Sequence, residues 1–178
     1  MAKTTFQGPV VSKKGFFNTG PGNVVDADSS VSLTVDTHAG RIVHNDAAGA
    51  VTYTLPATNA NSDSAIAGPG ADLNNLSNVG ARFEIFNSIT KTGDLVVQVA
   101  NATDVMIGGA LFIDDSSDNV VGFETASTSD TITLDGSTSG GLAGSIITCK
   151  AIGANRWGVQ VTSGGTGNLV TPFSAAVS

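Results

Sequence analysis

The stretch VSLTVDTHAGRIVHNDAAGAVTYTLP, residues 31–56, decides the fold because it holds three short extended segments in quick succession. Residues 31–35 alternate strictly between apolar and polar side chains, as a half-buried strand does. Residues 41–45 follow a His-Ala-Gly turn, and residues 51–56 end at a proline that stops the strand. The DAAGA segment between the last two strands, residues 46–50, favours a hairpin. The apolar residues of the last strand share one face: Val51, Tyr53 and Leu55.

Short strands of the same kind continue to residue 162. Turn residues separate them at spacings of about 8 to 12 positions, which is typical of a sandwich or a barrel. Helical patterns of ten residues or more are missing between them, which argues against alternating β and α units. We expect these strands at residues 81–87, 95–99, 104–114 (two short strands about Gly108 and Gly109), 120–126, 131–135, 145–152 and 156–162.

Composition also favours an all-β chain. Of the 15 acidic residues among 178, all but Glu84 and Glu124 are Asp, which prefers turns to helix interiors. A chain of this length buries a core without disulfides, and its one cysteine, Cys149, excludes an internal disulfide. We therefore expect an all-β, antiparallel β-sandwich of jelly-roll type with an extended N-terminal arm.

The chain divides into three parts. We expect an extended arm at residues 1–25, a sandwich body at residues 26–162 with a projecting loop at residues 57–80, and a flexible tail at residues 163–178. The arm holds three lysines and no acid, whereas the rest holds five of the eight bases and all 15 acids. The arm is therefore about +3 and the remainder about −10, so the body stays soluble by self-repulsion while the arm reaches toward acidic surfaces.

The arm contains three of the eight phenylalanines, which is unusual for a disordered segment. Its apolar residues bury against its own domain, a sister subunit or a separate partner, and of these we expect an intermolecular contact. The tail repeats the pattern with one apolar anchor. The residues expected to make these contacts are Phe6, Val10, Val11, Lys13, Lys14, Phe16, Phe17 and Phe173.

Motifs for catalysis or cofactor binding are weak. His38 and His44 fit no zinc spacing, so we expect surface or satisfied core histidines. The segment Gly136–Gly140 resembles a nucleophile elbow but has Thr at its centre. Cys149 lies in an apolar strand and is expected to be a small buried filler. We expect no enzyme and no cofactor.

Metal, sugar and nucleic-acid sites are also weak. The acidic cluster Asp114, Asp115 and Asp118 is the best calcium candidate, but a hydrated hairpin tip explains the same residues more simply. Trp157 and Tyr53 both fall on expected inward faces, which leaves no aromatic platform for sugars or single strands. An acidic body does not suit nucleic acid. No run approaches the roughly 20 apolar residues of a membrane span, and the N-terminus lacks a signal-peptide core.

Six segments together resemble virion structural proteins of tailed bacteriophages, particularly those of marine cyanobacterial phages. They are MAKTTFQGPVVSKKGF, VTYTLPA with GARFEIF, NATDVMIGG, SIITCKAIGANRWGVQVTSGGTG and the terminal TPF. The resemblance implies a β-rich capsid decoration protein, often trimeric, held on the outer shell by a terminal arm. Its partners would be the major capsid protein and further copies of itself, and it would be made in the host cytoplasm. A tail- or fibre-associated attachment protein is the main alternative, and a secreted carbohydrate-binding module is a weaker one.

Overall fold

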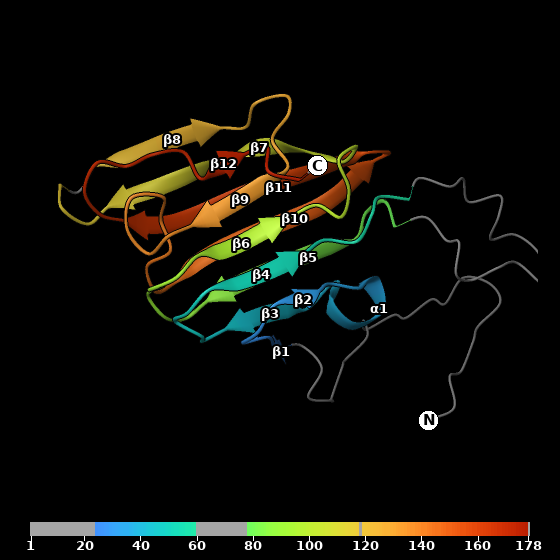
Figure 1. The fold of residues 1–178 in the computed structure, drawn as a ribbon, viewed down its shortest axis with the longest axis horizontal. Helices are drawn as coiled ribbons and strands as arrows, with labels where there is room; N and C mark the ends of the chain where they lie inside the picture. Colours follow the sequence, from blue (N-terminus) through green and yellow to red (C-terminus); the bar gives the residue numbers. More distant parts are fainter. Residues whose placement is uncertain (1–23, 60–77, 118, 178) are drawn as a thin grey trace, which may run out of the picture.

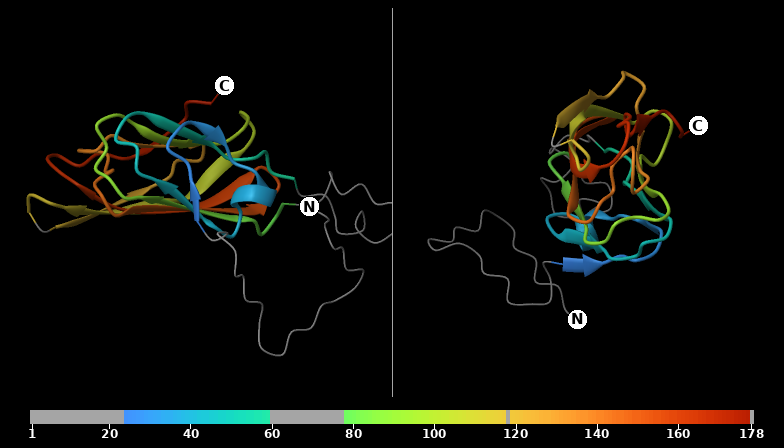
Figure 2. Two further views of the ribbon diagram at one scale, coloured as in Figure 1. Left: turned by 90° about the horizontal axis from the view of Figure 1, so that it is seen from below. Right: turned by 90° about the vertical axis from the view of Figure 1, so that its left-hand side faces the viewer.

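The computed structural model describes residues 24–59, 78–117 and 119–177, which form two β-sheets packed face to face (Figure 1). The larger sheet has seven strands in the order β1-β3-β5-β10-β11-β7-β8, and the smaller has five in the order β12-β9-β6-β4-β2. Seen from two further directions, the sheets form two layers (Figure 2). The expected all-β sandwich is confirmed.

The strands have these bounds. The seven-stranded sheet consists of β1 (Val24–Asp26), β3 (Ile42–Asn45), β5 (Arg82–Asn87), β7 (Val105–Asp114), β8 (Val120–Glu124), β10 (Ser145–Gly153) and β11 (Arg156–Gly165). The five-stranded sheet consists of β2 (Val31–Ser32), β4 (Val51–Thr54), β6 (Leu95–Gln98), β9 (Thr131–Leu134) and β12 (Phe173–Ser174). The short helix α1 spans Val35–His38.

Strands β1 to β6 alternate between the two sheets, so that successive pairs stack like the turns of a coil. β1, β3 and β5 are parallel neighbours in one sheet, and β2, β4 and β6 are parallel neighbours in the other. The hairpin expected between residues 41–45 and 51–56 is therefore wrong, because β3 and β4 lie in different sheets. Antiparallel pairing, expected throughout, joins β5–β10, β10–β11, β7–β8, β6–β9 and β9–β12. A jelly-roll connectivity is not confirmed by this mixed order.

Two buried asparagine side chains connect β3 to its neighbour β5 by a hydrogen bond. Asn45 lies opposite Asn87 in the parallel register, and its Nδ2 donates to Asn87 Oδ1 at 2.7 Å. The Tyr53 hydroxyl also donates to Asn45 Oδ1 at 3.3 Å, and Asn87 Nδ2 donates to the Ile89 carbonyl at 2.5 Å. Both asparagines are fully buried. Since buried polar groups need partners, this pair fixes the register of the coil.

The core lies between the sheets and is built by the inward half of each alternating strand. The expected inward or buried residues are confirmed, since Val51, Tyr53, Leu55, Cys149 and Trp157 are all buried. Phe83 and Ile85, which alternate along β5, are buried beside them. The single tryptophan therefore reports on unfolding.

Three segments differ from the expected strands. Residues 31–35 form only the two-residue strand β2, because the Thr34 amide donates to His38 Nδ1 at 3.0 Å and closes the turn of α1. Residues 104–114 hold one strand rather than two, because β7 runs on through Gly108. The C-terminal residues belong to the body: residues 163–165 extend β11, and Phe173–Ser174 form β12.

The continuity of β7 depends on its close approach to β11. Gly108 lies opposite Val159 in the parallel register and has a φ of 155°. A Cβ atom at this position would lie 1.8 Å from the Val159 carbonyl oxygen, which is far inside any contact distance. Only glycine therefore fits between the two strands.

We expect Gly108→Ala to destabilise the fold by about 3 kcal/mol or more, because the two strands must separate. Gly153→Ala is the matched control, since a Cβ atom there meets nothing within 4 Å. Its cost is expected to stay below about 1 kcal/mol. Urea unfolding followed by Trp157 fluorescence measures both. Equal effects of the two substitutions would contradict the close approach.

The long insert after β4 has a hydrogen-bonded base. The Asn59 amide donates to Asn78 Oδ1 at 2.7 Å, and the Asn78 amide donates to the Asn59 carbonyl at 2.9 Å. Thr58 donates from its amide (2.9 Å) and its hydroxyl (2.7 Å) to the buried Asp104 carboxylate. The ends of the insert are thus joined to each other and to the start of β7. Residues 60–77 of the expected projecting loop lie outside the described residues, so its projection stays a prediction.

Candidate interaction surface

The outer face of the seven-stranded sheet carries exposed apolar side chains. On β7, Leu111 is 51% and Ile113 is 54% exposed, and on β8 Val120 is 64% exposed. The register brings them together: Ile113 lies opposite Val120, and Leu111 is separated from Ile146 of β10 by one residue of β11. We call six exposed residues of this face the apolar patch: Ile107, Leu111, Ile113, Val120, Ile146 and Ile152.

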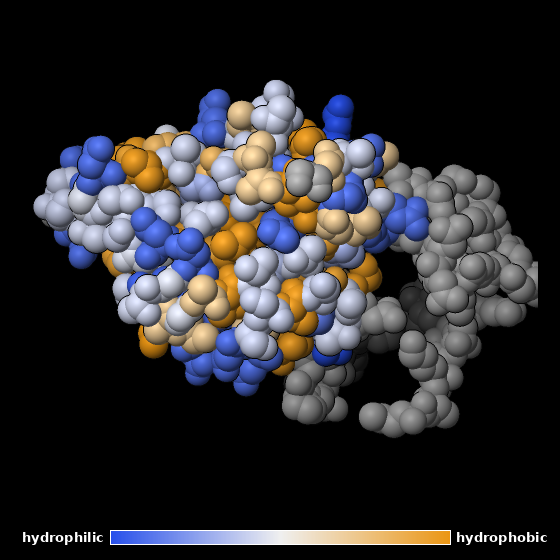
Figure 3. All heavy atoms as spheres, viewed as in Figure 1, coloured by the Kyte–Doolittle hydropathy of each residue, from blue (hydrophilic) through white to orange (hydrophobic). Residues whose placement is uncertain are grey.

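The outer face of the five-stranded sheet is different. Its outward residues are half-buried and mainly polar: Thr52, Thr54, Val96, Gln98 and Thr133. The space-filling view shows hydrophilic and hydrophobic residues intermixed on the side seen in Figure 1 (Figure 3). Single exposed apolar residues are ordinary on protein surfaces, but their gathering on one face is typical of an interaction site.

Outward glycines leave two shallow hollows in the apolar end of this face. One, of about 530 Å³, is lined by Gly109, Leu111, Gly122, Phe123, Glu124 and Gln160. The other, of about 290 Å³, is lined by Ile113, Asp115, Leu142, Gly144, Thr162 and Gly164. Apolar side chains beside hollows of this kind accept side chains of a protein partner.

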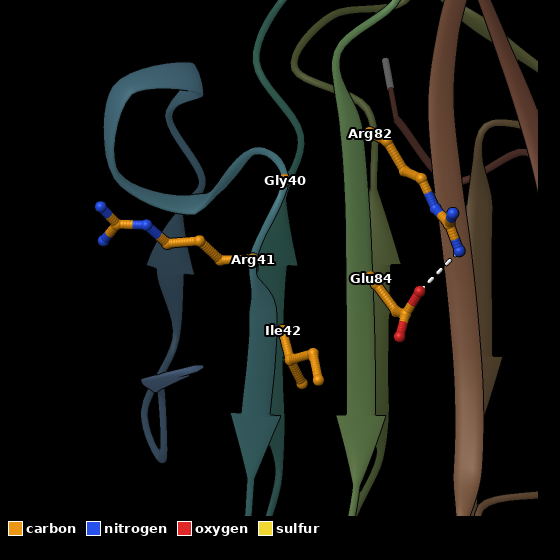
Figure 4. Close-up of a pocket in the computed structure, with 5 residues that line it drawn as sticks. All are labelled: Gly40, Arg41, Ile42, Arg82 and Glu84. Atoms are coloured by element: carbon orange, nitrogen blue, oxygen red, sulfur yellow. Dashed lines mark hydrogen bonds and ion pairs between the residues drawn. The ribbon is translucent and has the colours of Figure 1, made fainter. Parts of the chain in front are cut away.

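A third hollow, of about 370 Å³, lies over β3 and β5 at the other end of the same face (Figure 4). Arg82 and Glu84 point toward each other along β5 and form an ion pair of 2.6 Å. Arg41 extends away from them, and Ile42 supplies an apolar wall. The outer face therefore divides into a mainly apolar end over β7, β8 and β10, which also holds the exposed Lys150 and Glu124, and a charged end over β1, β3 and β5.

The charged end holds a chain of three hydrogen-bonded groups. Asp26 lies opposite His44 in the register, and Asp26 Oδ1 is 2.8 Å from His44 Nδ1. His44 Nε2 is 3.0 Å from Ser88 Oγ. Because a carboxylate only accepts, Nδ1 carries the proton in neutral His44, and Nε2 is then an acceptor for the Ser88 hydroxyl. The same hydroxyl also donates to the Asn45 carbonyl at 3.2 Å, so the two acceptors share one proton. This is the order of groups in a serine hydrolase triad.

Sequence reasoning missed this group because its members come from three strands and match no local motif. An activated serine also needs oxyanion donors and a place for a substrate. The three hollows described above are lined by other residues. The Asp26 side chain is 77% exposed, so water competes for its contact with His44. The geometry supports a structural role in which His44 ties β1 to β3 and to the end of β5.

We expect Ser88 to remain unmodified by a fluorophosphonate probe, which labels activated serines, because the group sits on an open sheet face. Intact-mass spectrometry measures the labelling. Labelling at Ser88 that disappears in His44→Ala, with Ser116 unmodified as an internal comparison, would instead identify an active nucleophile.

Most of the expected contact residues lie outside the described part of the chain: Phe6, Val10, Val11, Lys13, Lys14, Phe16 and Phe17. Phe173 is described and is only 8% exposed, because it pairs with Ile132 and packs into the core of its own chain. It is therefore an internal core residue and not an exposed anchor. Among the described residues, exposed apolar side chains gather instead in the apolar patch, which no sequence pattern singled out.

The other expected sites behave as ordinary structural residues. Burial raises the pKa of the Cys149 thiol to about 12, which agrees with a buried filler. His38 is buried and is bonded to Thr34. Hydrogen bonds from Ser116 and Ser117 lower the pKa of Asp114, and Asp118 lies outside the described residues. Within residues 24–59, 78–117 and 119–177, no cluster of three or more His, Cys, Asp or Glu side chains could hold a metal ion.

In comparisons with known proteins, no family model, curated protein or solved structure matches the chain. Among the described residues, no helix has the length and hydropathy needed to cross a membrane. Function therefore has to be inferred from the chain's own surface.

Proposed function

We propose that the chain is a non-enzymatic structural protein of a tailed-phage particle, bound to the outer capsid shell as a decoration protein. The apolar patch is the observation that carries this proposal. Six large aliphatic side chains stand on one sheet face, while the opposite outer face is mainly threonine and glutamine. A surface of this kind is suited to being covered by protein in the working state.

The size of the patch favours an assembly of many copies. Burying the remaining exposed half of each side chain is worth about 1 kcal/mol, or roughly 6 kcal/mol for all six. Association itself costs about 4 kcal/mol or more in lost freedom. One such contact is therefore weak by itself. Repeated across a shell, weak contacts become strong through multivalency, which suits a decoration protein.

In this proposal the partners are the major capsid protein and further copies of the chain, arranged as a homotrimer on the capsid exterior. The three lysines at the N-terminus, among them Lys13 and Lys14, steer the acidic body toward acidic patches of the shell. The resemblance to phage virion proteins supports the choice of a phage particle.

A tail- or fibre-associated attachment protein is the second candidate. The coil formed by β1 to β6 favours it, because units that stack in one direction build elongated shafts. The coil here is short, however, and antiparallel strands follow it from β7 onward. We therefore place the capsid shell first.

Co-sedimentation with purified capsids that lack this protein tests the proposal. We expect the wild-type chain to saturate the capsids at a fixed ratio to shell subunits. The double substitution Leu111→Asp and Val120→Asp is expected to weaken binding at least tenfold, because it places charge in the apolar patch.

Val170→Asp is the matched control, since Val170 is 45% exposed and lies outside the patch. It should bind like the wild type, and Trp157 fluorescence should show that all variants fold. Binding to purified tails instead of capsids would overturn the shell assignment in favour of the second candidate. A chain that binds neither would overturn both.

A further inference from the structure

The apolar patch needs an occupant, and the chain itself contains a suitable one. We propose that residues 1–23 of a neighbouring copy lie on the apolar patch, so that copies of the chain exchange their N-terminal arms. This inference rests on the proposed function, because it names the partner of the same surface.

The composition of the arm matches the patch. Besides Met1, residues 1–23 hold five phenylalanines and valines: Phe6, Val10, Val11, Phe16 and Phe17. They also hold three lysines and no acid, whereas the remaining chain carries a charge of about −10 by residue count. The acidic residues Asp115 and Glu124 line the two hollows of the patch, where lysines find opposite charge. Two acidic bodies repel each other, so the arm is a better occupant than the body of a second copy.

The position of the arm favours a neighbour over the same chain. Val24 begins β1, which is the edge strand farthest from β8. Three strand spacings of about 4.8 Å, or roughly 14 Å, separate β1 from β10, and five, or roughly 24 Å, separate it from β7. Phe16 precedes Val24 by eight residues, so a fully extended chain carries it at most about 29 Å. The arm of the same chain is therefore long enough to reach the patch, but its path from β1 runs across β3 and β5, the charged end of the face.

That path is costly because of what the charged end contains. The arm would cover the Arg82–Glu84 ion pair and the contact between Asp26 and His44, and both would lose water. A neighbour's arm enters over the opposite edge strand, β8, and meets the apolar Val120 first. It therefore gains apolar burial without covering the Arg82–Glu84 ion pair or the contact between Asp26 and His44.

Arm exchange also explains how a weak patch supports an assembly. Each copy gives an arm to one neighbour and receives an arm from another, which is a head-to-tail contact. Such contacts close into a ring when the rotation between copies permits, and the proposed homotrimer is a ring of this kind. The lysines of each arm also offset the repulsion between the acidic bodies.

Cross-linking between two different chains, each with one added cysteine, tests the exchange. Phe16→Cys is placed in a tagged chain and Val120→Cys in an untagged chain, and the two are mixed with a short bis-maleimide. Cys149 does not interfere, because it is fully buried and burial raises its thiol pKa. We expect a cross-linked pair of one tagged and one untagged chain. Val170→Cys in place of Val120→Cys is the control and should give none.

The solution mass provides an independent measurement. The full-length chain is expected to form an oligomer, and deletion of residues 1–23 should reduce its mass to that of one chain without changing Trp157 fluorescence. The combined Leu111→Asp and Val120→Asp variant should do the same, whereas Val170→Asp should not. Each of three results would overturn the exchange: a monomeric full-length chain, an oligomer that survives the deletion, or a cross-link only within single chains that carry both Phe16→Cys and Val120→Cys.

These results separate the inference from the proposed function. Failure of the cross-link and mass experiments together with continued capsid binding would reject arm exchange and leave the decoration role intact. Arm exchange without capsid or tail binding would reject the decoration role and keep the self-assembly.

Discussion

The parallel stacking of β3 on β5, fixed by the buried pair Asn45 and Asn87, is the constraint on which the rest of the fold depends. A slip of one residue would turn the inward faces outward and leave both amides without their partners. With the register fixed, the Tyr53 hydroxyl on the five-stranded sheet donates a hydrogen bond to Asn45 of this pair. The outward residues of neighbouring strands then lie directly opposite each other. The contact of Asp26 with His44 is one result of this arrangement.

Alternation made the inward faces predictable, because it depends only on neighbours in the sequence. Alternation places Tyr53 and Trp157 on inward faces, and both are buried. The coil was not predictable, because its turns differ in length: Val24 pairs with Ile42, 18 residues on, and Ile42 pairs with Glu84, 42 residues on. Because the turns of the coil differ in length, the sequence shows no fixed-period repeat. The link between β3 and β4 has the length of a hairpin loop, so its sequence predicts a hairpin although the two strands lie in different sheets.

The apolar patch was not predictable from the sequence either, because the face of its main strand, β7, is ambiguous. Strand β7 reads VMIGGALFID and is apolar at both odd and even positions, so alternation assigns no face to it. Its partners decide: Met106 and Phe112 point into the core, and Leu111 and Ile113 point outward. A strand that is apolar on both faces is typical of a sheet that is covered on both sides. Here the five-stranded sheet covers only the inward side, so Leu111 and Ile113 are exposed. The sequence signal was therefore present, but it could be read only after the layers were known.

The base of the insert after β4 has a practical consequence. Since Asn59 and Asn78 bond to each other and Thr58 is fixed by Asp104, the two ends of the insert are held together by the body itself. The entropy of closing a loop grows only slowly with its length. Foreign peptides grafted between these asparagines would add little strain to either sheet. The site is thus a natural attachment point for displaying antigens or tags on the surface of this protein.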